Sequence, residues 1–429
     1  MNKRIIIIGN GIAGVTTARH IRKNSDFEIT IVSKETKEFF SRTALMYVYM
    51  GHMKFEHTVP YESSFWKENR INLILDEVIT IDSENKTIQL KENEPLSYDD
   101  LIIATGSKPN KFGWPGQDLP QVECMYSKQD LDAIVKHTFD NRCQSAAVVG
   151  GGLIGIELVE MLASRNIKVT FLVRESSFWN NVLPKYESQM LNEHIRSHGI
   201  DLRLGLNLDS IVADDQGDVR AIKIKETGKE VACQFVGLST GVSPNIEWLK
   251  PSNIDTERGV SVNRFLETNI ENIYAIGDCA EQQKPNVGRR PIEAVWYTGR
   301  MMGETVAQTI CGNRTEYNPG HWFNSAKFFD IEYQTYGTVN AEEGEEHKHI
   351  HWRASGEEKC MTFAFEPSTR KFLGINTFGI RLRHETFDAW LSEKITVDEV
   401  IENLHKANFD PEFYKQYASE IRNHFKQTN

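Results

Sequence analysis

Two glycine-rich turns are the residues in this sequence whose spacing points most directly to chemistry. Each follows a short apolar run and precedes a helical stretch. The first glycine permits a tight turn, the second lets the backbone approach a pyrophosphate, and the third lets helix and strand pack closely. One such motif arises by chance, but two in the same context predict two dinucleotide sites. The glycines are Gly9, Gly11 and Gly14 in the first turn and Gly150, Gly152 and Gly155 in the second.

The elements around these turns must aim them at a ligand. Residues 5–8 are four consecutive isoleucines, which suit a strand buried on both faces of a parallel sheet. Each following helix would present its unpaired N–H groups and positive dipole end to the phosphates. We therefore expect alternating strands and helices. The predicted segments are a helix over Thr16–Lys23, strands over Glu28–Val32 and Lys168–Val173, and a helix over Leu158–Arg165.

The residues after the second strand of each motif indicate how the ribose is bound. A dinucleotide fold places an acid about twenty residues beyond the glycines, to accept a hydrogen bond from a ribose hydroxyl. Glu35, after Ser33 and Lys34, fits that acid, and a solvated surface carboxylate is the alternative. In the second motif Arg174 stands at this place, where a guanidinium could pair with a 2′-phosphate and favour NADPH. The neighbouring Glu175 could still serve the ribose of NADH.

Three further segments carry a family resemblance. They are residues 98–109, 239–245 and 272–280, the last with a Gly-Asp pair after an apolar strand. With the two glycine turns they make the chain similar to the flavoproteins with two dinucleotide-binding domains, the pyridine nucleotide-disulfide oxidoreductases. The resemblance implies FAD at the first turn and NADPH or NADH at the second. It also implies an enzyme that passes a hydride from NAD(P)H to FAD and then electrons to a second acceptor.

The same resemblance implies an α/β fold with two Rossmann-like three-layer domains and an α+β C-terminal interface domain. The NAD(P)-binding domain, residues 111–238, would be inserted into an FAD-binding domain made of residues 1–110 and 239–315. The interface domain would cover residues 316–429, where 359–365 and 371–378 resemble a hairpin. It would end in a helical tail, in which Val397, Val400, Ile401 and Leu404 share a helical spacing typical of a docking face.

The resemblance also assigns site residues. The residues expected to contact FAD are Gly9, Gly11, Ile12, Ala13, Gly14, Ser33, Lys34, Glu35, Arg42, Val78, Ala104, Thr105, Gly106, Gly277, Asp278, Glu293, Ala294, Val295 and Trp296. The residues expected to contact NAD(P)H are Gly150, Gly152, Leu153, Ile154, Gly155, Glu157, Arg174, Glu175 and Gly241.

The stretch 39–47 departs from the family where a redox cysteine would stand. Its place is taken by Thr43, and an alcohol forms neither a mixed disulfide nor a sulfenic acid. The same stretch is similar to the ferredoxin and rubredoxin reductase branch, with Arg42 matching an arginine that would meet the FAD pyrophosphate. Tyr47 replaces that branch's lysine, whereas Glu157 matches its glutamate. Glu157 and Tyr47 are therefore the candidate catalytic residues, and the alternative for Glu157 is a helix-start residue.

We accordingly expect the second acceptor to be a small ferredoxin- or rubredoxin-like protein. An NAD(P)H oxidase or quinone reductase, in the manner of the NADH oxidase branch, is the alternative. A flavin-bearing redox sensor or interaction protein is a remote one. The assembly of the chain, monomer or homodimer, stays open.

Composition excludes several other classes. The net charge of −11 argues against a nucleic-acid partner. Neither a signal peptide nor a membrane-spanning run is apparent, so we expect a cytoplasmic protein. The six cysteines are scattered without metal or disulfide spacing, so we expect no metal site.

Overall fold

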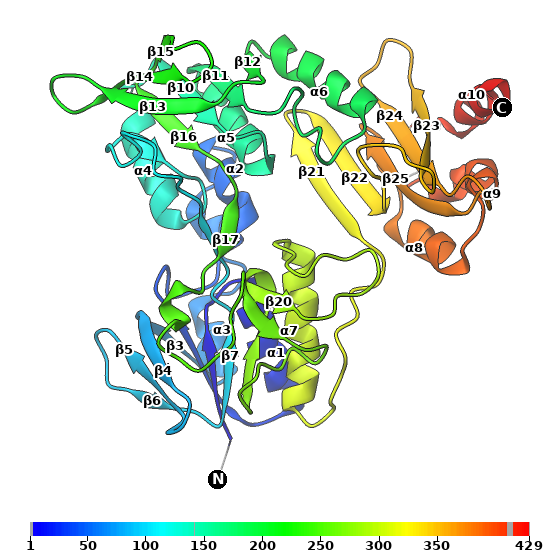
Figure 1. Cartoon of the computed structure of the whole chain (residues 1–429). Helices are drawn as coiled ribbons and strands as arrows, with labels where there is room; N and C mark the ends of the chain where they lie inside the picture. Colours follow the sequence, from blue (N-terminus) through cyan, green and yellow to red (C-terminus); the bar gives the residue numbers. More distant parts are fainter. Residues whose placement is uncertain (1–2, 141, 410–414, 429) are drawn as a thin grey trace. The chain divides into compact units, whose positions relative to one another are not determined.

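The computed structural model describes residues 3–140, 142–409 and 415–428 (Figure 1). The chain forms two compact units, and each is described by itself. Unit 1 comprises residues 1–112, 123–139 and 241–319. Unit 2 comprises residues 113–122, 140–240 and 320–429. Among the described helices, none is long and apolar enough to cross a membrane.

Unit 1 is built on a five-stranded parallel sheet in the order β19-β7-β1-β2-β3. The isoleucines of β1 form its centre, paired with β2 on one side and β7 on the other, and residues 5–8 are at most 5% exposed. A strand flanked on both edges and covered on both faces must be apolar throughout. The strands are β1 (Arg4–Ile8), β2 (Glu28–Ser33), β3 (Ile71–Leu75), β7 (Asp100–Ile103) and β19 (Ile273–Ala275).

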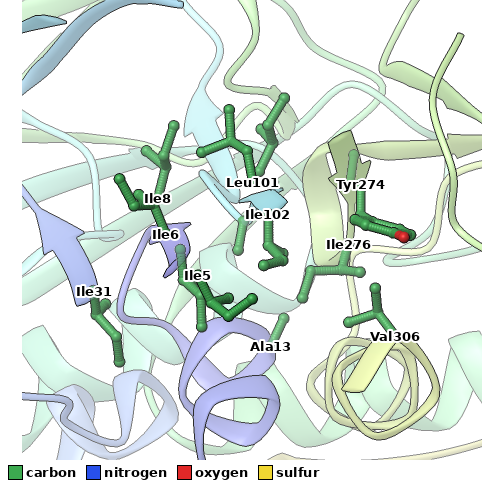
Figure 2. Packing of buried hydrophobic residues seen from close by; sticks show 14 of the residues in the cluster. Ile5, Ile6, Ile8, Ala13, Ile31, Leu101, Ile102, Tyr274, Ile276 and Val306 are labelled. Carbon is green, nitrogen blue, oxygen red and sulfur yellow. The ribbon is translucent and has the colours of Figure 1, made fainter. Parts of the chain in front are cut away.

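Two long helices pack together beside this sheet, α1 (Ile12–Asn24) and α7 (Trp296–Ile310). A Cβ on Gly303 would lie 2.6 Å from the Ala13 carbonyl oxygen, so a glycine lets the two backbones approach closely. Figure 2 shows Ile5, Ala13 and Val306 gathered in the core between the helices and the sheet.

Smaller elements complete unit 1. The pair β8 and β17 joins the two segments that carry the chain out of and back into this unit. The remaining strands are β4 (Val78–Asp82), β5 (Thr87–Leu90), β6 (Leu96–Ser97), β8 (Ser107–Pro109), β17 (Val242–Pro244), β18 (Val260–Val262) and β20 (Ala280–Gln282). The remaining helices are α2 (Leu45–Tyr49), α3 (Ser63–Glu68) and α4 (Lys128–Thr138), with short 3-10 turns at 42–44, 55–58, 247–249 and 277–279.

Unit 2 repeats the parallel-sheet plan with the strand order β12-β11-β10-β16-β9. Helix α5 (Leu153–Ser164) follows β10, and α6 (Lys185–Ser197) follows β11. The strands of this sheet are β9 (Val122–Glu123), β10 (Ser145–Val149), β11 (Lys168–Val173), β12 (Asp201–Leu204) and β16 (Phe235–Leu238). A separate antiparallel sheet contains β13 (Leu208–Ala213), β14 (Val219–Ile224) and β15 (Glu230–Ala232).

The C-terminal part of unit 2 is an antiparallel sheet in the order β21-β22-β25-β24-β23. The predicted hairpin is confirmed, because β24 and β25 pair antiparallel. The strands are β21 (Phe323–Phe328), β22 (Ile331–Gly337), β23 (Lys348–Arg353), β24 (Cys360–Phe365) and β25 (Phe372–Phe378).

The two faces of this sheet differ in polarity. One face joins α8 (His384–Glu393), α9 (Val397–Asn403) and α10 (Ala418–Thr428) in an apolar core that buries Val397 and Val400. The helical spacing in the tail therefore marks a packing face, as predicted. The opposite face carries a row of paired polar residues, Thr335, Asn376, Thr362 and His351. Helix α6 packs on that row, since Asn376 Nδ2 donates to Glu187 Oε2 at 2.8 Å.

The expected fold class is confirmed, with two Rossmann-like parallel sheets and an α+β C-terminal part. The first helix begins earlier than predicted, at Ile12 and not Thr16, because extended Gly11 already serves as its N-cap. The expected domain boundaries stay a prediction. Compact unit 1 includes residues 123–139, which were expected in the inserted domain.

Candidate functional site

The first glycine turn has the backbone geometry of a phosphate cradle. Gly9 has φ +114°, and a Cβ there would lie 2.1 Å from the Ala104 carbonyl oxygen. A Cβ on Gly14 would lie 2.1 Å from the Gly9 carbonyl oxygen, so only glycine allows this helix to start against the strand. A Cβ on Gly11 would meet nothing within 4 Å. The middle glycine therefore borders open space at the start of α1, beside Ile12 and Ala13, where a pyrophosphate would lie.

The segment after β2 contains a network around Glu35. Arg42 donates to both carboxylate oxygens of Glu35, at 3.0 and 2.5 Å, and the Lys128 backbone N–H donates to Oε1 at 2.9 Å. Ser33 Oγ donates to Asn10 Oδ1 at 2.9 Å and so joins the end of β2 to the glycine turn. The structure thus brings together Ser33, Glu35 and Arg42, while Lys34 pairs with Glu77 at 2.9 Å.

Tyr126 contributes to this network, although no sequence motif singled it out. Its carbonyl oxygen accepts from Arg42 Nη1 at 2.5 Å, and its ring lies 4.6 Å from the Arg42 guanidinium carbon. Its hydroxyl accepts from the Ser107 backbone N–H at 2.9 Å. Burial raises the pKa of Tyr126 to about 12, so the hydroxyl stays protonated. Tyr126 therefore positions both Arg42 and the turn after β7.

That turn carries the residues predicted from the second and third motifs. Thr105 Oγ1 donates to the Asn245 carbonyl oxygen at 2.9 Å, and Ser107 Oγ donates to Asp278 Oδ2 at 2.9 Å. Burial raises the pKa of the Asp278 carboxyl, opposed by the Ser107 hydrogen bond and the Arg42 charge. Gly277 has φ +70°, which suits the sharp exit from β19. Ala104, Gly106 and Asp278 thus converge at the carboxyl ends of β7 and β19.

The segment before α7 holds the other residues expected near FAD. Glu293 is 6% exposed, and its carboxylate pairs with Arg289 at 2.6 Å. Thr298 Oγ1 donates to the Glu293 carbonyl oxygen at 3.0 Å, which fixes the entry into α7 through Ala294, Val295 and Trp296. Val78 lies in β4 and is buried in the core of unit 1.

The second glycine turn has the same geometry as the first. Gly150 has φ +119°, and its Cβ would lie 2.3 Å from the Ser239 carbonyl oxygen. A Cβ on Gly155 would lie 2.1 Å from the Gly150 carbonyl oxygen, whereas one on Gly152 would meet nothing within 4 Å. Ser239 Oγ donates to the carbonyl oxygens of Val149 and Gly150, each at 3.0 Å, and so holds the turn. Leu153 and Ile154 then open α5.

The residues after β11 place a cation and an anion together. Arg174 Nε lies 2.7 Å from Glu175 Oε1, with side chains 76% and 23% exposed. An exposed guanidinium, which could pair with a 2′-phosphate, thus lies beside a carboxylate, which could accept from a ribose diol. Gly241, in unit 1, adopts φ +91°, and its carbonyl oxygen accepts from the Asn110 N–H at 3.0 Å.

The candidate catalytic residues lie in different units. Glu157 is in the first turns of α5, and burial, reinforced by the nearby Glu160, raises its pKa to about 7. A carboxyl that titrates near neutrality is typical of a functional site. Tyr47 lies in α2, with its ring stacked on His52 at 6.0 Å between centroids.

None of the six cysteines has the character of a redox thiol. All six are free, five are buried and Cys311 is partly buried. Burial raises the pKa of Cys124 and Cys143 to about 11 and that of Cys233 to about 12. It also raises the pKa of the Cys279, Cys311 and Cys360 thiols. Thr43, at the expected cysteine position, is exposed.

Both turns fit a dinucleotide. Each has a middle glycine bordering open space and outer glycines locked against backbone, the combination that a bound pyrophosphate requires. Residues 9–14 and Asp278 would hold FAD, and residues 150–155 with Arg174 or Glu175 would hold NAD(P)H.

Comparison with known proteins identifies the family of this chain. Residues 3–303 match the family model described as pyridine nucleotide-disulphide oxidoreductase. The chain is similar to an NADH oxidase of Methanocaldococcus jannaschii, with 33% identity over 74% of this chain and 72% of that one. It is also similar to a ferredoxin–NAD(P)(+) reductase of Sphingomonas, with 27% identity over 78% of this chain and 80% of that one.

Among solved structures, an NAD-dependent persulfide reductase from A. fulgidus has the same fold. The TM-score is 0.87 at 23% identity, covering 99% of this chain and 83% of that one. The matched family model covers both glycine turns and the Gly-Asp pair. The chain therefore belongs to the pyridine nucleotide-disulphide oxidoreductase family of FAD-dependent NAD(P)H oxidoreductases.

Proposed function

We propose that the enzyme passes electrons from NAD(P)H, through FAD, directly to a small ferredoxin- or rubredoxin-like protein. The observation that carries the proposal is the state of the cysteines. The thiolate is the reactive form in disulfide and persulfide chemistry, and burial in apolar surroundings disfavours it. Every cysteine of the chain has a raised pKa, and an exposed threonine stands at position 43. Electrons therefore leave without a protein thiol as carrier.

The chain's own residues bind and orient the cofactors. FAD, when bound, supplies the chemistry that accepts a hydride and releases electrons to the acceptor. Residues 9–14 would hold the FAD pyrophosphate, and Asp278 would accept hydrogen bonds from its ribityl chain. Residues 150–155 hold the pyrophosphate of NAD(P)H. Glu157, with a pKa near 7, would orient the nicotinamide by accepting from its carboxamide.

An oxidase is the second candidate, because the NADH oxidase relative is 33% identical. Oxygen, like a protein acceptor, needs no thiol. A quinone reductase belongs to the same class of direct electron donors. These readings share the donor half of the reaction and differ only in the acceptor.

A reoxidation experiment separates the candidates. The FAD-loaded protein is reduced anaerobically with one equivalent of NADPH and then mixed with oxygen, a benzoquinone, a ferredoxin or a rubredoxin. We expect reoxidation by ferredoxin or rubredoxin to be at least tenfold faster than by oxygen. Rapid reoxidation by oxygen, with none by either protein, would establish the oxidase instead.

We further propose a modest preference for NADPH over NADH, set by Arg174. Its side chain is 76% exposed and can leave Glu175 to pair with a 2′-phosphate. The Arg174→Ala variant should lose roughly tenfold in kcat/KM for NADPH, about 1.4 kcal/mol, while keeping its value for NADH. The Glu175→Gln variant is the matched control and should affect NADH more. Equal losses for both nucleotides in Arg174→Ala would contradict the assignment.

A further inference from the structure

Two histidines at the end of α6 converge with a carboxylate from the C-terminal sheet, all within unit 2. His194 and His198 are four residues apart and share one face of the helix. Asp330 occupies the turn of the β21–β22 hairpin, and its Oδ1 lies 2.8 Å from His194 Nε2 and 3.6 Å from His198 Nε2. Figure 1 shows α6, in green, alongside the yellow strands β21 and β22. Three potential ligand atoms thus lie within 4.8 Å of one another.

The contacts of His194 bring two carboxylates to its ring. Its ring is 1% exposed, yet Nδ1 lies 2.6 Å from Glu358 Oε2 while Nε2 faces Asp330. Among the described residues, neither buried ring nitrogen has a hydrogen bond of acceptable geometry. Both ring nitrogens therefore face a carboxylate, and a metal ion at Nε2 would give the ring and Asp330 a shared partner.

His198 directs a second ring nitrogen toward the Asp330 carboxylate. Its Nδ1 lies 3.0 Å from the His194 carbonyl oxygen, which can only accept. We therefore assign the proton to Nδ1, which leaves the Nε2 lone pair toward Asp330. Phe329 helps to hold the His198 ring in place, because the two rings stack at 4.2 Å between centroids. Phe329 itself has φ +55° in the β21–β22 turn. The negative dipole end of α6 also favours a cation.

We propose that His194 Nε2, His198 Nε2 and Asp330 form a binding site for a divalent transition metal, with Zn²⁺ the best fit. Two imidazoles and a carboxylate are a common zinc ligand set, and solvent completes the fourth position. Glu358 Oε2 lies 2.6 Å from His194 Nδ1, on the side of the ring where carboxylates commonly orient metal-bound histidines. The metal enters from solvent, since the Asp330 side chain is 76% exposed.

Bound metal would join three segments of unit 2 that are far apart in the sequence. They are the end of α6, the β21–β22 turn and the β23–β24 turn that carries Glu358. A second group, Glu187, His351 and Cys360, also brings ligand atoms together. Glu187 and Cys360 are both fully buried, so that group offers no route from solvent.

The test uses the full-length, FAD-loaded protein after chelator treatment and removal of the chelator. Zn²⁺ is titrated in competition with a chromogenic chelator, and Co²⁺ is added separately to record its ligand-field absorption. The variants are His198→Asn and Asp330→Asn, and His405→Asn, an exposed histidine of the tail, is the matched control. FAD content and circular dichroism establish that each variant is folded.

We expect the native protein and His405→Asn to bind one equivalent of Zn²⁺ and to show tetrahedral Co²⁺ bands. Each site variant should bind at least tenfold more weakly and lose those bands, and zinc should raise the melting temperature only where it binds. Zinc binding of equal affinity in the native protein and both site variants would overturn the proposal. So would the absence of stoichiometric binding to the native protein.

Discussion

Replacing Glu187 by glutamine should stabilise the protein at alkaline pH. Glu187 is fully buried between α6 and the C-terminal sheet, where its carboxylate accepts from the side chains of Asn376 and Thr362. Burial raises the pKa of this carboxyl from its ordinary value of 4.5 to about 7, against the opposing effect of those two side chains. Glutamine preserves the shape and the oxygen that accepts from Asn376, but it cannot ionise.

The sign of the effect follows from proton binding. Between pH 4.5 and about 7 the unfolded chain has lost this proton while the folded protein keeps it. Lower pH therefore favours folding, and the contribution of Glu187 to the free energy of unfolding falls by about 1.4 kcal/mol per pH unit as the pH rises through this range. Above pH 7 Glu187 lowers the free energy of unfolding by roughly 3 kcal/mol, and below pH 4.5 it has no such effect.

The assay compares melting temperatures of Glu187→Gln and the native protein from pH 5 to pH 8.5. The difference should be small at pH 5 and grow to roughly 5–10 °C at pH 8, for a cooperative unit of about two hundred residues. Glu193→Gln on the same helix is the control, since that side chain is 68% exposed and its variant should change little at any pH. A variant that follows the native protein at every pH, or that melts earlier at pH 8, would refute the reasoning.

Two further predictions concern the cofactor sites. Because a Cβ on Gly11 or Gly152 meets no atom within 4 Å, Gly11→Val and Gly152→Val should both fold. Gly11→Val should be purified without FAD, whereas Gly152→Val should keep FAD but bind NADPH at least tenfold more weakly in a fluorescence titration. Normal cofactor binding in both variants would contradict the assignment of the two glycine turns as phosphate cradles. Because the pKa of Glu157 is about 7, flavin reduction by NAD(P)H should slow as the pH falls through 7 and the carboxylate becomes protonated. The pH profile of the stopped-flow reduction rate should lose its inflection near pH 7 in Glu157→Gln. The same inflection in that variant would exclude Glu157 as its source.

The parts of the molecule that the sequence predicts are those dictated by local backbone chemistry. Gly9 and Gly150 require positive φ, and Gly14 and Gly155 leave no room for a Cβ, so spacing alone identifies both turns. The β24–β25 hairpin and the apolar stripe of α9 follow likewise from local periodicity.

The contacts that the sequence does not predict join residues that are distant along the chain. Tyr126 meets Arg42 across eighty-four positions, and Ser107 meets Asp278 across 171. His194 and Asp330 lie on a helix and a hairpin turn whose meeting depends on the packing of α6 against the sheet. A short sequence motif does not predict contacts between residues that are so far apart in the chain. The expectation of no metal site rested on the spacing of the cysteines and took no account of His194 and His198, which are four residues apart.

We expect NAD(P)H to reduce FAD in this chain without participation of a protein thiol. An anaerobic titration of the FAD-loaded protein with NADPH, followed by the flavin absorbance, tests it directly. We predict that one equivalent of NADPH per FAD completes the reduction, since no disulfide is present to take a second pair of electrons. A requirement for two equivalents, or a flavin that neither NADPH nor NADH reduces, would contradict the account.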